Sequence, residues 1–208
     1  MLMRCTCSGL AQLQGGNPQA AVEHIEQAVE QDWSRAEYHG HLGIALAGVE
    51  QRQRAAECLY EAIRLDPRQW DARYNLGNLL RLLGKLDEAV EQYQVALKAR
   101  PDSAETHYNL ANTLRDLGRL DEAAVGYRQA LQWKPNYLKA CTNLGNVLRD
   151  QRKFDEAEHC HRQALRIKPD YASAHHNLGR TLTELGRLDE AMEVLAVAAA
   201  ADEGLIEA

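Results

Sequence analysis

Asn75-Leu76-Gly77-Asn78 recurs as Asn143-Leu144-Gly145-Asn146. Asn109-Leu110-Ala111-Asn112 lies midway between these stretches and Asn177-Leu178-Gly179-Arg180 follows them, so consecutive copies are 34 residues apart. A fixed short period without insertions is typical of stacked supersecondary units, each too small to bury its own apolar face. Such arrays present long surfaces, so the period favours a binding function over a catalytic one.

The period can be followed through nearly the whole chain. Six units fit the sequence, at residues 2–35, 36–69, 70–103, 104–137, 138–171 and 172–205. Alanine fills two columns in every unit, which are Ala21, Ala55, Ala89, Ala123, Ala157 and Ala191, and Ala28, Ala62, Ala96, Ala130, Ala164 and Ala198. Small residues in fixed columns indicate that two backbones approach closely there, because a larger side chain would overpack the contact.

One unit shows how each repeat folds. Apolar residues recur near the helical period in 70–83 and again in 88–99. Gly84 suits the left-handed turn between these segments, and the acidic pair at 87–88 suits the positive start of the second helix. Pro101 cannot continue that helix. The sequence therefore predicts an all-α protein in which every unit is a helix–turn–helix, with about twelve helices in total.

The Leu-Gly pair, both Ala columns and the closing Pro resemble the tetratricopeptide repeat. The resemblance implies a right-handed α-solenoid that forms a single domain over residues 1–208. The residue pattern of the repeats, as in Tyr171-Ala-Ser-Ala-His-His-Asn-Leu-Gly, is similar to that of the repeat half of O-linked N-acetylglucosamine transferases and their bacterial relatives. The first helices of tetratricopeptide units line an inner, concave surface, and the resemblance implies that this surface binds protein.

The candidate binding residues lie in the predicted first helices. They are Tyr74 and Tyr108, a first Asn column of Asn75, Asn109, Asn143 and Asn177, a second Asn column of Asn78, Asn112 and Asn146, and the arginines Arg81, Arg115 and Arg149. Asn is unfavourable in a helix interior, but its amide matches the hydrogen-bonding needs of a peptide backbone. In the transferases that the chain resembles, the first column grips extended peptide main chain. The alternative is that both columns make hydrogen bonds between helices.

Other function classes find little support in the sequence. The net charge of −6 argues against nucleic acid, and no apolar run approaches the roughly 20 residues of a membrane span. The repeated Asp-Glu pairs occupy helix starts rather than one catalytic site, and the His column at residues 39, 107 and 175 is spread too widely to share a metal ion. We therefore expect no enzyme activity, no cofactor and no metal. Five cysteines, an odd number, favour a reduced, cytoplasmic protein.

Three functions remain open for such a chain. It could be a free adaptor that binds a partner protein or an extended peptide in its groove. It could instead be the substrate-receiving arm of a larger glycosyltransferase-like enzyme, or a self-assembling scaffold. The last unit carries apolar residues at Val194, Leu195 and Val197 without a polar capping helix, which predicts an exposed face for self-association.

Overall fold

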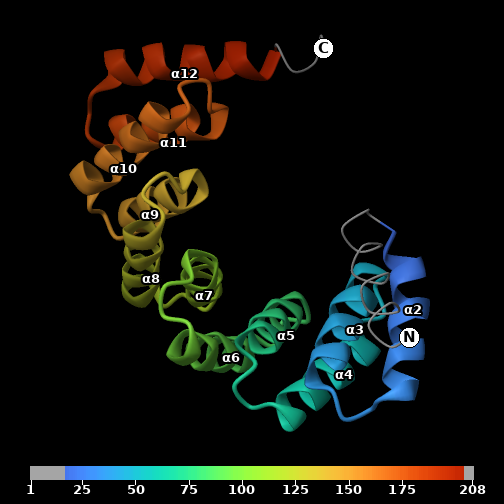
Figure 1. Ribbon diagram of the computed structural model, residues 1–208. Coiled ribbons are helices and arrows are strands. Elements are labelled where there is room, and N and C mark those ends of the chain that lie inside the picture. Colours follow the sequence, from blue (N-terminus) through green and yellow to red (C-terminus); the bar gives the residue numbers. More distant parts are fainter. Residues whose placement is uncertain (1–16, 204–208) are drawn as a thin grey trace. The chain divides into compact units, whose positions relative to one another are not determined.

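The computed structural model describes residues 17–203, and this range contains eleven α-helices and no strand (Figure 1). The predicted all-α class is therefore confirmed. The first helix of the first predicted unit falls on residues outside the described range. The helices are α2 Pro18–Gln31, α3 Ala36–Gly48, α4 Arg52–Leu65, α5 Trp70–Leu82, α6 Leu86–Ala99, α7 Ala104–Asp116, α8 Leu120–Trp133, α9 Leu138–Asp150, α10 Phe154–Ile167, α11 Ala172–Glu184 and α12 Leu188–Glu203.

The helices form two compact units, which divide after Pro101. In the first unit α3 packs on α4 and α5 packs on α6, while contacts of α2 with α3 and of α4 with α5 join consecutive repeats. In the second unit the pairs are α7 with α8, α9 with α10 and α11 with α12, joined through α8 with α9 and α10 with α11. Within each unit, the second helix of one repeat thus packs on the first helix of the next.

The helix boundaries keep the predicted period. First helices begin at residues 36, 70, 104, 138 and 172, and second helices at 52, 86, 120, 154 and 188. Asp87 and Glu88 lie in the first turn of α6 as expected, and the same acidic pair opens α8, α10 and α12. Acidic side chains there complement the positive end of the helix dipole.

The turn between the two helices of a repeat needs one residue in the left-handed region. Gly84, Gly118 and Gly186 fill this position with φ near +75°, as the sequence predicts for glycine. Glu50 and Arg152 take the same position in two other repeats, at φ 61° and 62°. The repeat therefore imposes the turn even where the residue has a Cβ atom, at a local cost in backbone energy.

The small-residue columns are places of close helix approach, as predicted. Every residue of the two Ala columns is at most 6% exposed. A Cβ atom on Gly77 would lie 2.7 Å from the ring of Tyr93, and one on Gly179 would lie 2.5 Å from Leu195. These glycines allow a large side chain of the second helix to rest directly on the backbone of the first.

The column that opens each first helix ties that helix to the turn before it. The Nε2 atoms of His39 and His175 lie 2.9 and 2.7 Å from the carbonyl oxygens of Trp33 and Pro169, six residues earlier. Arg73 donates to the carbonyl of Pro67 at the same spacing. These contacts give the column a structural role between repeats.

Candidate functional site

The candidate binding residues lie on first helices α5, α7, α9 and α11, and all are half-buried except Asn112, which is 6% exposed. Half-buried side chains on one helix face suit contact with a partner, but their internal bonds decide how much hydrogen-bonding capacity they retain. The two Asn columns differ in this respect.

The second Asn column joins the two helices of a repeat. The Tyr93 hydroxyl donates to Oδ1 of Asn78 at 2.7 Å, and the Tyr127 hydroxyl donates to Oδ1 of Asn112 at 2.6 Å. Both tyrosine rings are fully buried, and burial raises the pKa of Tyr127 to about 12. These Asn side chains satisfy buried phenols, which is the structural alternative that the sequence left open.

The repeat of α9 and α10 departs from this arrangement because His161 replaces the tyrosine. Its ring lies against Gly145, as the Tyr93 ring lies against Gly77. Both ring nitrogens of His161, Oδ1 of Asn146 and Nη1 of Arg149 are buried without a hydrogen-bond partner among the described residues. Burial, and then the charge of Arg149, lower the pKa of His161 to about 4. The imidazole is therefore neutral near neutral pH.

The first Asn column makes more varied contacts. Asn75 donates to the carbonyl of Asp71 in its own helix at 2.8 Å. Asn143 donates to Oδ1 of Asn112 at 3.0 Å and to the Tyr108 hydroxyl at 3.2 Å, so it links α9 to α7. Asn109 also has an interaction partner.

Asn177, the last member of the first column, lines a cavity of about 420 Å³ between α11 and α12. His176 and Ser173 of α11 and Leu195 of α12 share this cavity. Asn177 therefore borders open space, whereas Asn143 is committed to contacts between repeats.

The aromatic and arginine candidates are also engaged. The rings of Tyr74 and Tyr93 lie 6.3 Å apart, and Tyr108 lies 5.9 Å from Tyr127 and 4.8 Å from Tyr137. Arg115 pairs with Asp116 at 3.2 Å, while Arg149, whose side chain is only 12% exposed, approaches Asp150 at 3.5 Å. Arg81 has a partner as well. Cationic groups thus lie on the same helices as the Asn columns.

The predicted C-terminal face is only partly exposed. Val194 packs against the core formed by Leu178, Leu182 and Ala191, and Leu195 covers Gly179. Val197 is 49% exposed, and α12 also exposes Met192 at 65%. The described part of α12 therefore buries more of its apolar surface than the sequence pattern indicated.

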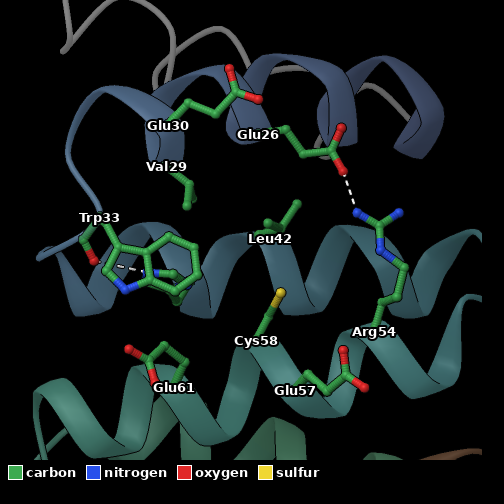
Figure 2. Close-up of a pocket in the computed structure, with 10 residues that line it drawn as sticks. Glu26, Val29, Glu30, Trp33, Leu42, Arg54, Glu57, Cys58 and Glu61 are labelled. Carbon is green, nitrogen blue, oxygen red and sulfur yellow. Dashed lines mark hydrogen bonds and ion pairs between the residues drawn. The ribbon is translucent and has the colours of Figure 1, made fainter.

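A cavity in the first unit contains functional candidates that sequence reasoning missed. It has a volume of about 580 Å³ and lies over α3, between the second helices α2 and α4. Figure 2 shows Trp33 at one end, with glutamates of α2 along one edge and glutamates of α4 along the other. One signal was available, because Trp33 stands 34 residues before Pro67, at the column that Pro fills in the next four repeats.

No group of three His, Cys, Asp or Glu side chains within residues 17–203 is arranged to hold a metal ion. None of the helices in this range is long and apolar enough to cross a membrane. Cys58, Cys141 and Cys160 are free thiols.

Sequence comparison identifies the repeats. Family models for the tetratricopeptide repeat match residues 58–91, 77–114, 102–170 and 142–206. Together with the helix pairs, these matches define the chain as a tetratricopeptide-repeat protein, a class consistent with protein interaction. No curated protein matches the chain significantly.

Solved structures share the fold. The pilF protein of Pseudomonas aeruginosa matches with a TM-score of 0.85 at 19% identity, over 98% of this chain and 91% of that one. YrrB, described as a tetratricopeptide-repeat protein with an unusual peptide-binding site, matches with a TM-score of 0.77 at 24% identity, over 86% of this chain and 93% of that one. MamA from Desulfovibrio magneticus matches with a TM-score of 0.75 at 19% identity, over 82% and 96%. At these identities the likeness supports the fold alone.

Proposed function

We propose that the chain is a non-catalytic protein-binding module that receives an extended peptide or a segment of a partner protein on its first helices. The observation that carries the proposal is the half-buried first Asn column, which places one amide per repeat on α7, α9 and α11 of the second unit and one on α5 of the first. Amides at a regular spacing can bond to a main chain whatever its sequence, and the nearby arginines can bind acidic side chains. The peptide-binding site described for YrrB is consistent with this use of the fold.

The structure sharpens the choice of test residues. Asn143 donates to Asn112 and Tyr108, so its removal loses two hydrogen bonds between α9 and α7 and should lower stability. Asn177 borders a cavity. Asn109 is half-buried on α7. Asn109→Ala with Asn177→Ala therefore tests binding, and Asn143→Ala is the matched variant for structure.

Peptides selected by phage display against the whole chain supply a ligand for this test. If the amides bind main chain, the double variant should weaken the dissociation constant by roughly 5- to 150-fold, which corresponds to about 1–3 kcal/mol for two uncharged hydrogen bonds. Its melting temperature should fall by less than that of Asn143→Ala, because Ala is the better helix former and offsets part of the loss of the Asn109 interaction. Unchanged affinity in the double variant, together with a lowered melting temperature, would assign the first column to architecture.

Two other functions remain as alternatives. The similarity of the repeats to those of O-linked N-acetylglucosamine transferases favours a substrate-receiving arm, and a catalytic domain in the same reading frame would support it. The exposed Met192 and Val197 of α12 favour self-association instead. Light scattering over a range of concentrations distinguishes that function, since a strict monomer would contradict it.

A further inference from the structure

The cavity between α2 and α4, called here the α2–α4 groove, combines an apolar floor with an aromatic wall. Val29 and Leu42, both 5% exposed, form the floor together with Cys58. Burial raises the pKa of the Cys58 thiol to about 11, so this part of the floor is uncharged. Trp33 closes one end and is 61% exposed (Figure 2). The groove can therefore accept an aliphatic chain beside an indole face.

The indole of Trp33 is held in place although much of it faces solvent. Its ring meets the buried His39 ring edge-on, with centroids 4.5 Å apart. The same histidine contacts the Trp33 carbonyl oxygen at 2.9 Å. A fixed, exposed indole is a favourable surface for a cation, because its quadrupole attracts positive charge to the ring face.

The rim of the groove is acidic. Four glutamates and one arginine line it, giving a formal charge of −3. Glu26 is neutralised by Arg54 at 2.6 Å, and Glu61 by Arg64 of the same helix at 2.6 Å. Glu30 and Glu57 have no ion pair with any residue in the described range. Glu57 accepts a hydrogen bond from the uncharged Gln53 at 3.3 Å. Two carboxylates without an ion pair thus stand on opposite sides of the floor, one on α2 and one on α4.

A groove at the corresponding position in the second unit shows which features of the α2–α4 groove belong to the repeat and which belong to this site alone. It lies over α9 between α8 and α10, three repeats later, and measures about 310 Å³. Leu131, Leu144 and Cys160 occupy its floor at the positions of Val29, Leu42 and Cys58. The apolar floor is therefore a property of the repeat.

The rim differs between the two grooves. Glu57 and Glu61 correspond to His159 and Gln163 in the second unit, and Glu30 corresponds to Gln132. The ion pair across the groove is kept with its polarity reversed, since Arg128 of α8 pairs with Glu156 of α10 at 2.9 Å. The lining of the second groove sums to zero charge. The acidity and the indole are therefore particular to the first unit.

We propose that the α2–α4 groove is a second binding site, which takes an arginine or lysine side chain from a basic segment of a partner protein. The aliphatic stem lies on Val29 and Leu42, the cationic head reaches Glu30 and Glu57, and Trp33 supplies a face for the cation. This site lies between second helices and is distinct from the Asn columns on the first helices. The near-neutral charge of the matched groove explains why only one of the two selects a cation.

The test is an NMR titration of the whole ¹⁵N-labelled chain, followed at the indole N–H signals of its three tryptophans. The probe is a short acetylated peptide that contains two arginines, compared with the same peptide containing citrulline, which keeps the shape and loses the charge. The Trp33 signal should shift with the arginine peptide and not with the citrulline peptide. Trp70, which already carries Arg100 on its ring, and Trp133, which is 50% exposed, serve as internal references.

Charge removal provides the matched variants. Glu30→Gln with Glu57→Gln should weaken binding of the arginine peptide by about threefold to tenfold, as expected for two exposed ion pairs. Glu23→Gln with Glu91→Gln changes the net charge equally at exposed positions outside the groove and should leave binding unchanged. Added salt should weaken binding, because exposed charges are screened.

Several outcomes would overturn the proposal. These are equal shifts with both peptides, no shift of Trp33, or an equal loss of affinity in the two double variants. A Trp33 shift that depends on protein concentration without peptide would instead assign the groove to a second copy of the chain. The Asn109→Ala, Asn177→Ala variant should bind the arginine peptide like wild type, so a failure of this site can be told from a failure of the first-helix site.

Discussion

Replacing His161 with tyrosine tests whether the α9–α10 repeat can adopt the packing of the other repeats, in which a buried tyrosine bonds to an Asn of the first helix. In two other repeats a buried tyrosine rests on the first helix and donates to an Asn, at 2.7 Å from Tyr93 and 2.6 Å from Tyr127. The α9–α10 repeat keeps the acceptor, Asn146, and keeps Gly145 beneath the ring. His161→Tyr should therefore restore the missing bond without a clash.

The expected gain has two parts. One new hydrogen bond contributes about 0.5–1.5 kcal/mol, and satisfying a buried oxygen that now lacks a partner adds to it, so the free energy of unfolding near neutral pH should rise by about 1–3 kcal/mol. The second part depends on pH, because the pKa of His161 falls from 6.5 to about 4 in the folded state.

Below pH 6.5 the unfolded chain binds a proton at this histidine before the folded chain does, so wild type loses stability as the pH falls toward about 4. The 2.5-unit difference between 6.5 and about 4 corresponds to about 3 kcal/mol. The variant lacks this loss. Its advantage should therefore grow by up to that amount over the same window.

Chemical denaturation followed by circular dichroism, at several pH values between about 7 and 4, measures both parts. His159→Tyr, at an exposed position of the same helix, controls for the loss of one histidine. Parallel stability curves for wild type and His161→Tyr would refute the buried, neutral imidazole. A less stable variant at neutral pH would refute the shared packing rule.

Three further substitutions test the repeat, each measured as a change in the free energy of unfolding. Glu50→Gly should add about 0.5–1 kcal/mol, because Glu50 occupies the left-handed turn position at φ 61°, and a lowered melting temperature would contradict this. Ala123→Leu should cost about 1–3 kcal/mol through overpacking at a fully buried column, so an unchanged melting curve would mean that the register is wrong. Tyr127→Phe should cost about 0.5–1.5 kcal/mol by removing the bond to Asn112, and equal stability would show that this bond contributes nothing.

Much of the fold could be predicted because its determinants are local or strictly periodic. Turn positions, first-turn acids and small-residue columns depend on backbone sterics and dipoles that act within one repeat. Arg152 takes the left-handed position at the same register, although its residue type gives no sign of it. Once one unit was assigned, the others followed.

The roles of the Asn columns could not be predicted in the same way. Helical spacing shows that Asn78 and Asn112 share a face, but not that a tyrosine fifteen residues later reaches them. The binding and structural interpretations use the same residues and differ only in which atoms approach the amide. The contacts place Asn78 and Asn112 in the interior network, and binding by the first column stays a prediction.

The groove could not be predicted because its lining comes from two successive repeats, whereas a column follows one position along the repeats and does not show which side chains of neighbouring repeats meet. The ion pairs between successive second helices differ in which helix carries the arginine. Arg128 with Glu156 and Arg162 with Glu190 place arginine on the earlier helix, and Glu26 with Arg54 reverses the order.

Exposed ion pairs of this kind contribute at most about 1 kcal/mol to the free energy of unfolding. The same two positions can form the pair whichever of the two helices carries the arginine. Folding therefore constrains neither the presence nor the direction of the pair strongly, and Tyr60 and Gln94 stand at the position of Glu26 in the next two repeats. The floor of the groove is set by packing, while the sign of its rim is free to vary with what it binds. Within one unit, a repeat protein can in this way keep the same helix packing at successive junctions, and the binding that we propose beside Trp33 needs a change only at the rim.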